Sequence, residues 1–264
     1  MINVSIVLPT INEGENLKNL IPNIEAELQY TEILSYEIIV VDDGSTDNTK
    51  EIIDKFNKEN EKIFLIEREE EPSLPKSIYE GIKTANYEYV LWLDADGSMS
   101  PKDVAKLAQE QTNSPNDVII GSRFVEGGGY KGATIDSNTS IFQAMRSVYN
   151  SEDSVLAVLL SRWFNIFLAR LLSFGVKDIT SGFIIGKKEY FNENPFIHSS
   201  YGDYFIYMLE DLYKNRVKCK ELGYLCLTRI HGSSKTGTNY FQLFKRGIPY
   251  IRAVLKIRKN NAKD

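Results

Sequence analysis

Cysteine and histidine are scarce in this chain of 264 residues, which has only two of each. Cys219 and Cys226 do not form a CxxC motif, and no histidine stands near them at the spacing of a metal site. This pattern argues against a disulfide framework or a zinc site of the usual kinds. We therefore expect two ordinary thiols, buried or half-exposed, in a protein of the reducing cytoplasm.

Long apolar runs and an excess of positive charge are also lacking. No run reaches the roughly 18 to 20 residues that a helix needs to cross a bilayer. The opening segment MINVSIVLPT has neither the apolar length nor the cleavage site of a signal peptide. The formal net charge of −5, with a pI near 5.3, argues against nucleic acid as a partner.

The composition, with 42% hydrophobic and 25% charged residues, is that of a globular protein that can form a sizeable core. The length suits one large α/β domain, or one domain with a tail. Short apolar runs alternate with segments of helical periodicity, which predicts a mainly parallel sheet flanked by helices. Ligands of such sheets bind beyond the carboxyl ends of the strands. The predicted strands are 3–8, 36–41, 62–67, 89–93 and 117–121, and the predicted helices are 16–30, 46–58, 76–85 and 101–111.

The second half of the chain has a different pattern. Residues 126–153 contain Gly, Ser and Asn without clear periodicity, which predicts a mobile loop or an insertion. Residues 154–174 are strongly apolar, with Arg162 and Arg170 embedded, and predict a helix that either belongs to the core or contacts a membrane. A further helix is expected at 201–214.

Asp94 and Asp96 follow the fourth predicted strand. Side chains two residues apart at a strand end point to the same side. Like charges this close need a cation or a proton to compensate them. A hard divalent cation takes carboxylate oxygens together with substrate phosphates. The pair therefore indicates either a metal site for a diphosphate or a turn in which aspartate accepts hydrogen bonds from the next backbone amides.

Other polar residues after apolar runs each have two interpretations. Asp42 suits ribose hydroxyls, or a turn before the next helix. Arg123 suits a phosphate, or a salt bridge to a neighbouring acid. Asp178, in the segment DITSGF, either holds a loop or faces an acceptor. Arg229, with the polar residues 233–235, either binds a diphosphate or belongs to a surface loop.

Several strings follow one another along the chain: IVLPTINEGENL, IIVVDDGSTDNT, YVLWLDADGSMSP, VIIGSRFVEGG, SRWFNIFLARLL, DITSGF and RIHGSSKTG. Together they resemble family 2 glycosyltransferases of the GT-A fold. Within that family they look most like the dolichol-phosphate mannose synthases and related polyprenyl-phosphate hexosyltransferases. The resemblance covers about residues 3 to 236. The first strings are general to the family, whereas SRxxN, DxxSGF and the Arg…Ser-Lys string narrow it to the lipid-phosphate group.

The resemblance implies a Rossmann-like GT-A domain over residues 1–236, followed by a basic amphipathic tail over 237–264. It implies a metal-dependent, inverting transfer of a hexose from GDP-mannose or a UDP-hexose to a polyprenyl or dolichyl phosphate. Mannose is the first candidate for the transferred sugar. The cofactor would be Mg²⁺ or Mn²⁺. The residues that bind the donor would be Pro9, Glu13, Asp42, Asp94, Ala95, Asp96, Arg229 and Lys235. The metal would be bound by Asp94, Asp96 and Ser98, and the acceptor phosphate by Arg123 and Arg162. The catalytic residues would be Asp94, Asp96 and Arg123.

The chain departs from the family's pattern at several positions. Ile11 stands where an aromatic residue is frequent, and Ser98 where many relatives have Gln as a further metal contact. The residues LPKS at 74–77 replace a usual L-G-x-A segment. The stretch before Arg162 is longer than expected, so Arg146 is a rival for the acceptor role.

A phosphate acceptor needs no general base, because its second pKa of about 6 leaves it anionic at pH 7. It needs positive charge, which Arg123 and Arg162 would supply, while a metal stabilises the leaving diphosphate. Were the acceptor a saccharide or protein hydroxyl, Asp203 would be the candidate base, although we prefer a helix-capping role for it. A non-catalytic nucleotide-sugar-binding subunit is a third alternative, against which the intact Asp94 and Asp96 pair argues.

The segment 240–258 places apolar residues near one face, with Lys and Arg around them, although Gly247 and Pro249 interrupt it. Such a helix can lie in the interface of an anionic membrane, pack on the domain or bind an integral membrane partner. Relatives often carry transmembrane helices after this point, whereas this sequence shows no such apolar segment there. We therefore expect peripheral attachment at the cytoplasmic face of a membrane, or a partner embedded in it.

Overall fold

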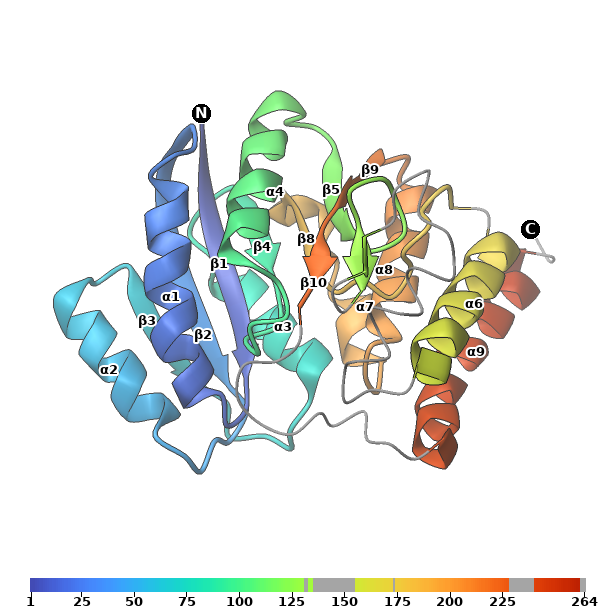
Figure 1. Cartoon of the computed structure of the whole chain (residues 1–264), viewed down its shortest axis with the longest axis horizontal. Coiled ribbons are helices and arrows are strands. Elements are labelled where there is room, and N and C mark those ends of the chain that lie inside the picture. Colours follow the sequence, from blue (N-terminus) through green and yellow to red (C-terminus); the bar gives the residue numbers. More distant parts are fainter. Residues whose placement is uncertain (131–132, 135–154, 173, 228–239, 262–264) are drawn as a thin grey trace.

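The computed structural model describes residues 1–130, 133–134, 155–172, 174–227 and 240–261. Within these residues seven strands form one sheet, in the order β3-β2-β1-β4-β8-β5-β9 (Figure 1). All of its pairings are parallel except those of β8. The prediction of a mainly parallel α/β sheet is thus confirmed. The strands are β1 (Ile2–Thr10), β2 (Ile33–Asp42), β3 (Ile63–Glu67), β4 (Tyr89–Trp92), β5 (Val118–Ser122), β8 (Ile184–Lys187) and β9 (Cys219–Gly223), and a small second sheet has β10 (Leu225–Cys226), β6 (Gly129–Tyr130) and β7 (Ala133–Thr134).

Helices cover both faces of the large sheet. The helices α1, α2 and α4 share one buried cluster with it, and α3, α6, α7, α8 and α9 share the other. Because both faces are covered, β1 is buried along nearly its whole length, with Ile6 and Leu8 in one cluster and Val7 in the other. The helices are α1 (Gly14–Leu28), α2 (Thr49–Glu59), α3 (Leu74–Thr84), α4 (Pro101–Asn113), α6 (Val155–Leu172), α7 (Asn194–Ile197), α8 (Tyr204–Lys214) and α9 (Tyr240–Asn261), with a short 3-10 helix at Lys188–Tyr190.

Local chemistry explains where these helices begin and how closely they pack. The Ser100 side chain accepts a hydrogen bond from Asp103 N at 3.2 Å, and Pro101 occupies the first position of α4, as predicted. On α3, a Cβ added at Gly81 would lie 2.3 Å from Val7 Cγ1. The glycine therefore lets α3 approach β1 more closely than any other residue would.

Two strands of the large sheet, β8 and β9, were not predicted. The strand β8 has only four residues and pairs antiparallel with both β4 and β5, whereas alternating strands and helices predict only parallel neighbours. The strand β9, with the sequence CKELG, has no apolar run. The insertion of β8 places the residues that precede it, 181–183, between the ends of β4 and β5.

The predicted helices of the second half are confirmed, with one correction. The C-terminal helix α9 is continuous through Gly247 and Pro249, so the expected interruption is wrong. Packing against α6 and α8 outweighs the poor helix propensity of these two residues. Figure 1 shows α9 beside α6 at one end of the molecule. The buried residues of α9 that share the core of α6 and α8 are Ala253, Val254 and Ile257.

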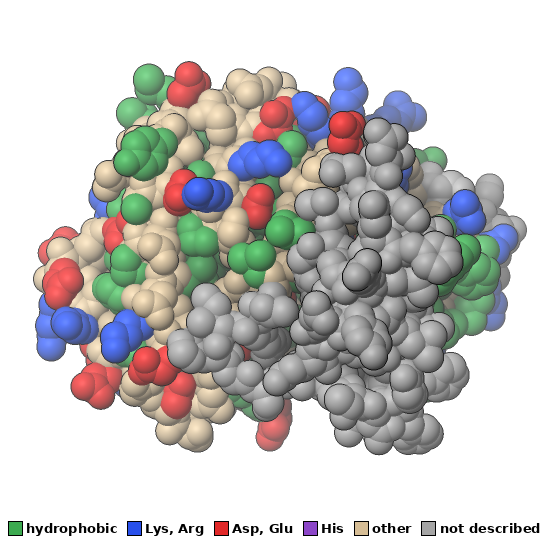
Figure 2. All heavy atoms as spheres, viewed as in Figure 1, with side chains coloured by type: hydrophobic (Ala, Val, Ile, Leu, Met, Phe, Trp, Pro, Cys, Tyr) green, Lys and Arg blue, Asp and Glu red, His purple; other side chains and the backbone are tan. Residues whose placement is uncertain are grey.

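None of the helices in the described ranges combines the length and the apolar character needed to cross a membrane. Exposed aromatic side chains nevertheless stand on α6. Trp163 is 66% exposed and Phe167 is 61% exposed, and the exposed Arg170 follows on the same helical face. Figure 2 shows hydrophobic side chains beside Lys and Arg side chains at this end of the molecule. Most of the predicted 126–153 loop lies outside the described residues.

Candidate active site

Eight of the residues predicted for the site meet at one edge of the large sheet. The strands β1, β2, β4 and β5 all point the same way, so their carboxyl ends share that edge. The antiparallel β8 begins at the same edge. The structure thus brings together, at these strand ends, the predicted residues Pro9, Glu13, Asp42, Asp94, Ala95, Asp96, Ser98 and Arg123.

The loops after β1 and β2 are joined to each other through Asn12. Its backbone has a positive φ of 56°, a conformation that asparagine tolerates better than most residues. The Asn12 side-chain oxygen accepts hydrogen bonds from Thr46 N at 2.7 Å and Asp47 N at 3.3 Å, and Asn12 N donates to Ser45 Oγ at 2.8 Å. Asp47 in turn accepts a hydrogen bond from Gly14 N. This loop pair forms the part of the edge after β1 and β2, and Asn12 was not predicted to belong to it.

The two adjacent aspartates after β2 have different partners. Asp42 accepts hydrogen bonds from the backbone N and side-chain hydroxyl of Ser45, which is the turn that the sequence left as an alternative. Asp43 forms a buried ion pair with Arg68 and accepts a hydrogen bond from Ser73 N. Both carboxylate oxygens of Asp43 therefore hold the loop in place. The binding of a ribose by Asp42 stays a prediction. Arg68, which stands far along the chain, was not predicted.

The carboxylate pair lies in a tight turn directly after β4. Asp96 is buried, and its Oδ1 accepts a hydrogen bond from Ser98 N at 2.9 Å. Gly97 between them has a φ of 76°, which glycine adopts without strain. The chain passes this turn again later, where Leu227 N donates to Ser98 O at 2.8 Å. The turn interpretation of Asp96 is thus confirmed, and it presents Asp94 and Asp96 together at the sheet edge.

The donor set of this turn fits a hard divalent cation. Asp94 and Asp96 offer carboxylate oxygens and Ser98 a hydroxyl, which are oxygen ligands of the kind that Mg²⁺ and Mn²⁺ prefer. No group of three or more His, Cys, Asp or Glu side chains suited to a metal exists in the described part of the chain. An ion held here would therefore need further oxygens from a substrate or from water.

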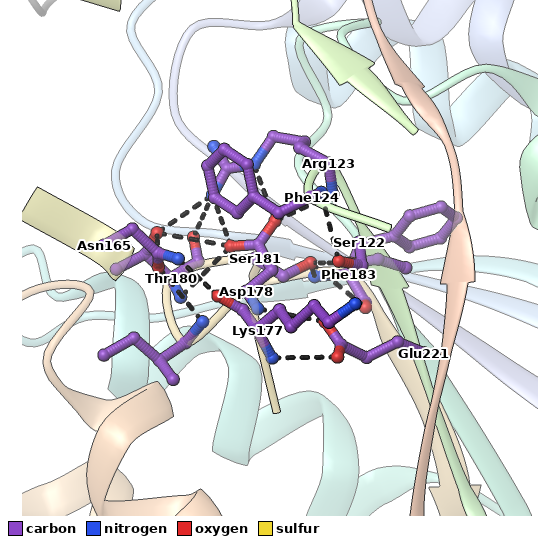
Figure 3. Close-up of polar contacts among 12 residues, drawn as sticks. Ser122, Arg123, Phe124, Asn165, Lys177, Asp178, Thr180, Ser181, Phe183 and Glu221 are labelled. Carbon is purple, nitrogen blue, oxygen red and sulfur yellow. Dashed lines mark hydrogen bonds and ion pairs between the residues drawn. The ribbon is translucent and has the colours of Figure 1, made fainter. Parts of the chain in front are cut away.

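A buried salt bridge lies on the other side of β8. Asp178 is fully buried, and it accepts hydrogen bonds from Arg123 N at 2.9 Å and from Arg123 Nε and Nη2 at 2.8 Å each (Figure 3). Burial alone would lower the pKa of Arg123, but the Asp178 charge raises it well above its ordinary value. Asp178 therefore holds a loop, and Arg123 forms the salt bridge that the sequence left as an alternative. Binding of an acceptor phosphate by Arg123 stays a prediction.

The loop that carries Asp178, residues 177–180, is also held by two side chains that were not predicted as site residues. The buried Asn165 of α6 donates to Lys177 O and accepts from Ile179 N at 3.1 Å. Glu221 of β9 accepts from Lys177 N at 2.8 Å and from Asp178 N at 2.9 Å. Figure 3 shows these side chains converging on the loop from separate elements. The only signal in the sequence was the string SRWFN, in which Asn165 had no assigned role.

Four predicted arginine and lysine residues lie partly or wholly outside the described part of the structure. Arg162 lies in α6, three residues before Asn165, and its side chain is outside the described part of the structure. Arg146, Arg229 and Lys235 lie outside the described residues altogether. Their roles stay predictions.

Asp203 was expected to cap a helix, and this detail is wrong. It stands at the start of α8, but its side chain makes no capping bond there. Instead its Oδ1 accepts hydrogen bonds from Ser200 N at 3.2 Å and Tyr201 N at 2.8 Å, which closes the preceding turn. Next to it, the buried Tyr204 hydroxyl accepts a hydrogen bond from Trp92 Nε1 at 3.1 Å, linking α8 to the last residue of β4.

The thiol of Cys226 lies near the carboxylate pair and stays protonated at neutral pH. Burial raises its pKa to about 11; the Arg123 charge opposes this shift, while Asp96 and Asp94 add to it. Burial likewise raises the pKa of Cys219 to about 12. Both residues are free, half-buried thiols, as expected.

Comparison with known families shows what this arrangement resembles. A family model described as "Glycosyl transferase family 2" matches residues 5–194. The match contains the carboxylate pair, Arg123 and the loop 177–180. It therefore includes both sides of the candidate site.

Two relatives differ in how much of each chain they share. A dolichol-phosphate mannosyltransferase of Pyrococcus furiosus is 38% identical over 125 residues, which are 47% of this chain and 34% of that protein. The match thus spans about a third of that relative's length. An uncharacterized protein of Methanocaldococcus jannaschii is 30% identical over 195 residues, which are 72% of this chain and 74% of that protein.

Among solved structures, glucosyl-3-phosphoglycerate synthase of Mycobacterium tuberculosis, in complex with Mn²⁺, UDP and glucosyl-3-phosphoglycerate, has a similar fold. The TM-score is 0.64 at 18% sequence identity, and the superposition covers 97% of this chain and 79% of that one. At this identity the likeness concerns the fold alone. It confirms the predicted GT-A architecture.

Proposed function

The chain belongs to glycosyl transferase family 2 and is a glycosyltransferase, and we propose that it transfers a hexose, mannose before others, from a nucleotide sugar to a polyprenyl or dolichyl phosphate. The observation that carries this proposal is the pair of carboxylates after β4 and the arginine after β5, at one sheet edge on either side of β8. The identity with the Pyrococcus furiosus dolichol-phosphate mannosyltransferase supports a lipid phosphate as acceptor.

The donor would be GDP-mannose or a UDP-hexose, bound over the loops after β1, β2 and β4. Asp94 and Asp96, with Ser98, would hold a Mg²⁺ or Mn²⁺ ion together with the donor diphosphate. When bound, the ion supplies positive charge that stabilises the leaving diphosphate. The residues proposed for the base, the ribose and the first phosphate contacts are Pro9, Glu13, Asp42 and Ala95.

Arg229 and Lys235 are proposed to close over the donor diphosphate. The support for this comes from the last described residue before them, Leu227. Its backbone N donates to Ser98 O at 2.8 Å, so the chain leaves the described region beside the carboxylate pair. Two cationic side chains that follow so closely suit a diphosphate.

The acceptor would be held by positive charge and not activated by a base. A phosphomonoester is already largely dianionic at pH 7. Arg123 and Arg162 would bring this anion close to the donor, against the repulsion of its diphosphate. The phosphate oxygen would then attack the anomeric carbon on the face opposite to the leaving group, which inverts the configuration.

The Asp203→Asn variant tests the absence of a general base. We expect its transfer rate to stay within about threefold of wild type, because a missing base lowers rates by about 10² or more. Asparagine keeps the oxygen that accepts hydrogen bonds from Ser200 N and Tyr201 N, so the turn should hold. Initial rates and the melting temperature are the measurements. A hundredfold loss at an unchanged melting temperature would favour a hydroxyl acceptor.

We further propose that the chain docks peripherally on the cytoplasmic face of a membrane through α6 and α9. The exposed Trp163 and Phe167 give this end of the molecule an apolar surface. On α9, Leu255 is exposed between the exposed Arg252 and Lys256. Aromatic side chains beside cationic ones suit the interface of an anionic bilayer. An integral membrane partner is the alternative occupant.

Vesicle sedimentation tests this surface. Wild type is expected to bind vesicles of phosphatidylcholine and phosphatidylserine. A Trp163→Ser/Phe167→Ser variant is expected to bind at least about tenfold more weakly, since even one such side chain contributes about 1.5 to 3 kcal/mol on burial. The control is Tyr30→Ser, which removes an exposed aromatic side chain outside α6 and α9. Equal binding by all three proteins would contradict a membrane face here.

A transfer assay with a panel of labelled nucleotide sugars and a membrane extract tests the function itself. The expected product partitions into organic solvent and releases its sugar in mild acid, as a glycosyl phosphate lipid does. The label that appears there identifies the donor. If no donor yields a lipid-soluble product, while label appears on saccharide or protein, the acceptor class proposed above is wrong.

A further inference from the structure

The two arginines proposed for the acceptor phosphate belong to different parts of the fold. Arg123 follows β5 in the sheet, whereas Arg162 lies in α6. One phosphate can contact both only if α6 keeps a fixed place relative to the sheet edge, because small displacements of binding groups have large effects on rates. In the described part of the structure, the loop 177–180 contacts Arg123 on one side and α6 on the other.

On the sheet side, the loop is joined to Arg123. The Asp178 carboxylate accepts from Arg123 Nε and Nη2 at 2.8 Å each. Thr180 adds two contacts, since Arg123 Nη2 donates to its backbone O at 3.0 Å and to its Oγ1 at 2.9 Å. The guanidinium group is thereby fixed in orientation as well as position.

On the helix side, the loop is joined to Asn165, which is 1% exposed. Its Nδ2 donates to Lys177 O, and its Oδ1 accepts from Ile179 N at 3.1 Å and from Thr180 Oγ1 at 3.2 Å. The Thr180 hydroxyl thus contacts Asn165 and the Arg123 guanidinium at once (Figure 3). At this turn, these hydrogen bonds fix the position of α6 along its axis and its rotation about that axis.

Arg162 stands three residues before Asn165 in the same helix. Positions three apart in an α-helix lie on neighbouring parts of one side. Whatever fixes the rotation of α6 at Asn165 therefore also fixes the place of position 162 on the helix. Glu221 of β9 makes the loop 177–180 more rigid, because its carboxylate accepts hydrogen bonds from the backbone N of both Lys177 and Asp178.

We propose that Asn165 is a positioning residue for the acceptor phosphate. By joining α6 to the loop 177–180, it sets the place of Arg162 relative to Arg123, with the Thr180 hydroxyl as the shared contact. This inference rests on the proposed lipid-phosphate acceptor. It distinguishes the acceptor side from the donor side, since the hydrogen bonds of Asn165 in the described part of the structure go to residues of the loop 177–180.

The test compares Asn165→Leu with a matched control, Gln111→Leu. Gln111 is also fully buried on a helix, and its Nε2 donates to the backbone oxygens of Ser114 and Asp117 at 2.9 and 3.0 Å. These contacts lie at the opposite end of β5 from Arg123. Both changes replace an amide by an apolar group of similar size and remove buried hydrogen bonds, so each is expected to lower the stability.

Steady-state kinetics with a short-chain prenyl monophosphate separate the two variants. Asn165→Leu is expected to raise the KM for the prenyl phosphate, or lower kcat/KM for it, by about 10- to 100-fold. The KM for the nucleotide sugar should stay within about twofold of the wild-type value, which corresponds to less than about 0.5 kcal/mol of binding free energy. Gln111→Leu should change neither constant, although its melting temperature also falls.

A second variant covers the case in which Asn165→Leu does not fold. Thr180→Val keeps the shape of the side chain and removes only the hydroxyl shared by Asn165 and Arg123. It is expected to raise the prenyl phosphate KM in the same direction, by a smaller factor.

Three outcomes would overturn the inference or its premise. Prenyl phosphate constants at wild-type values in both Asn165→Leu and Thr180→Val would overturn it, and so would equal changes in the donor and acceptor constants. In either case, lipid product from wild type would leave the proposed function intact. If wild type itself fails to use the prenyl phosphate, the proposed function fails, and the role of Asn165 fails with it.

Discussion

The Asp96→Asn variant is expected to transfer sugar at about a hundredth to a thousandth of the wild-type rate. Asp96 is buried in the turn after β4, with Asp94 two residues before it. Asparagine has the same shape and keeps the oxygen that accepts from Ser98 N. It removes the negative charge, which a divalent cation needs at a site with so few protein ligands. The loss should therefore arise from the metal and not from a change of fold.

Initial rates measured over a Mn²⁺ titration separate these causes. In the variant, the Mn²⁺ concentration that gives half of the maximal rate should rise, while the melting temperature of the metal-free protein should not fall. The control is Asp54→Asn, which removes the same charge from an exposed position on α2 and should keep the wild-type rate. A wild-type rate and an unchanged Mn²⁺ response in Asp96→Asn would remove Asp96 from the metal site.

Much of the fold could be predicted, because in the first 122 residues each strand is an apolar run and each helix has a periodic face. The strands β1, β4 and β5 are buried on both faces, so that burial and sequence agree there. This agreement ends at β8 and β9. The strand β8 takes its place through pairing with β4 and β5 and not through its own pattern, and β9 is half exposed with no apolar run. Pairing between distant segments has no local signature.

The same limit applies to the site. Acids that follow directly on strands, such as Asp42, Asp94 and Asp96, were found because their position in the sequence determines their position on the sheet. The partner of Arg123 was not found, because Asp178 stands 55 residues later and reaches it only through the insertion of β8. Asn165 joins the site from α6 in the same way. Residues that hold a site together come from anywhere in the chain, whereas residues that touch ligands gather at strand ends.

The salt bridge between Arg123 and Asp178 leads to the largest expected effect on stability. The Arg123 side chain is 13% exposed and that of Asp178 is 0% exposed. Asparagine at position 178 would leave the guanidinium buried without its counter-charge. Breaking a buried pair in this way lowers the free energy of unfolding by about 3 to 5 kcal/mol, and urea denaturation of Asp178→Asn should show a loss of this size.

A double-mutant cycle shows whether this loss arises from the pair itself. With Arg123→Met as the second change, the buried charge is gone, so the double variant should be clearly more stable than the sum of the single losses predicts. Glu67→Gln is the control at a surface pair, since Lys50 and Glu67 are both more than half exposed and their contact should matter far less. If the two single losses simply add, Arg123 and Asp178 do not stabilise each other in solution. The loop 177–180 would then need another anchor, and the joint placement of Arg123 and α6 would lose its physical basis.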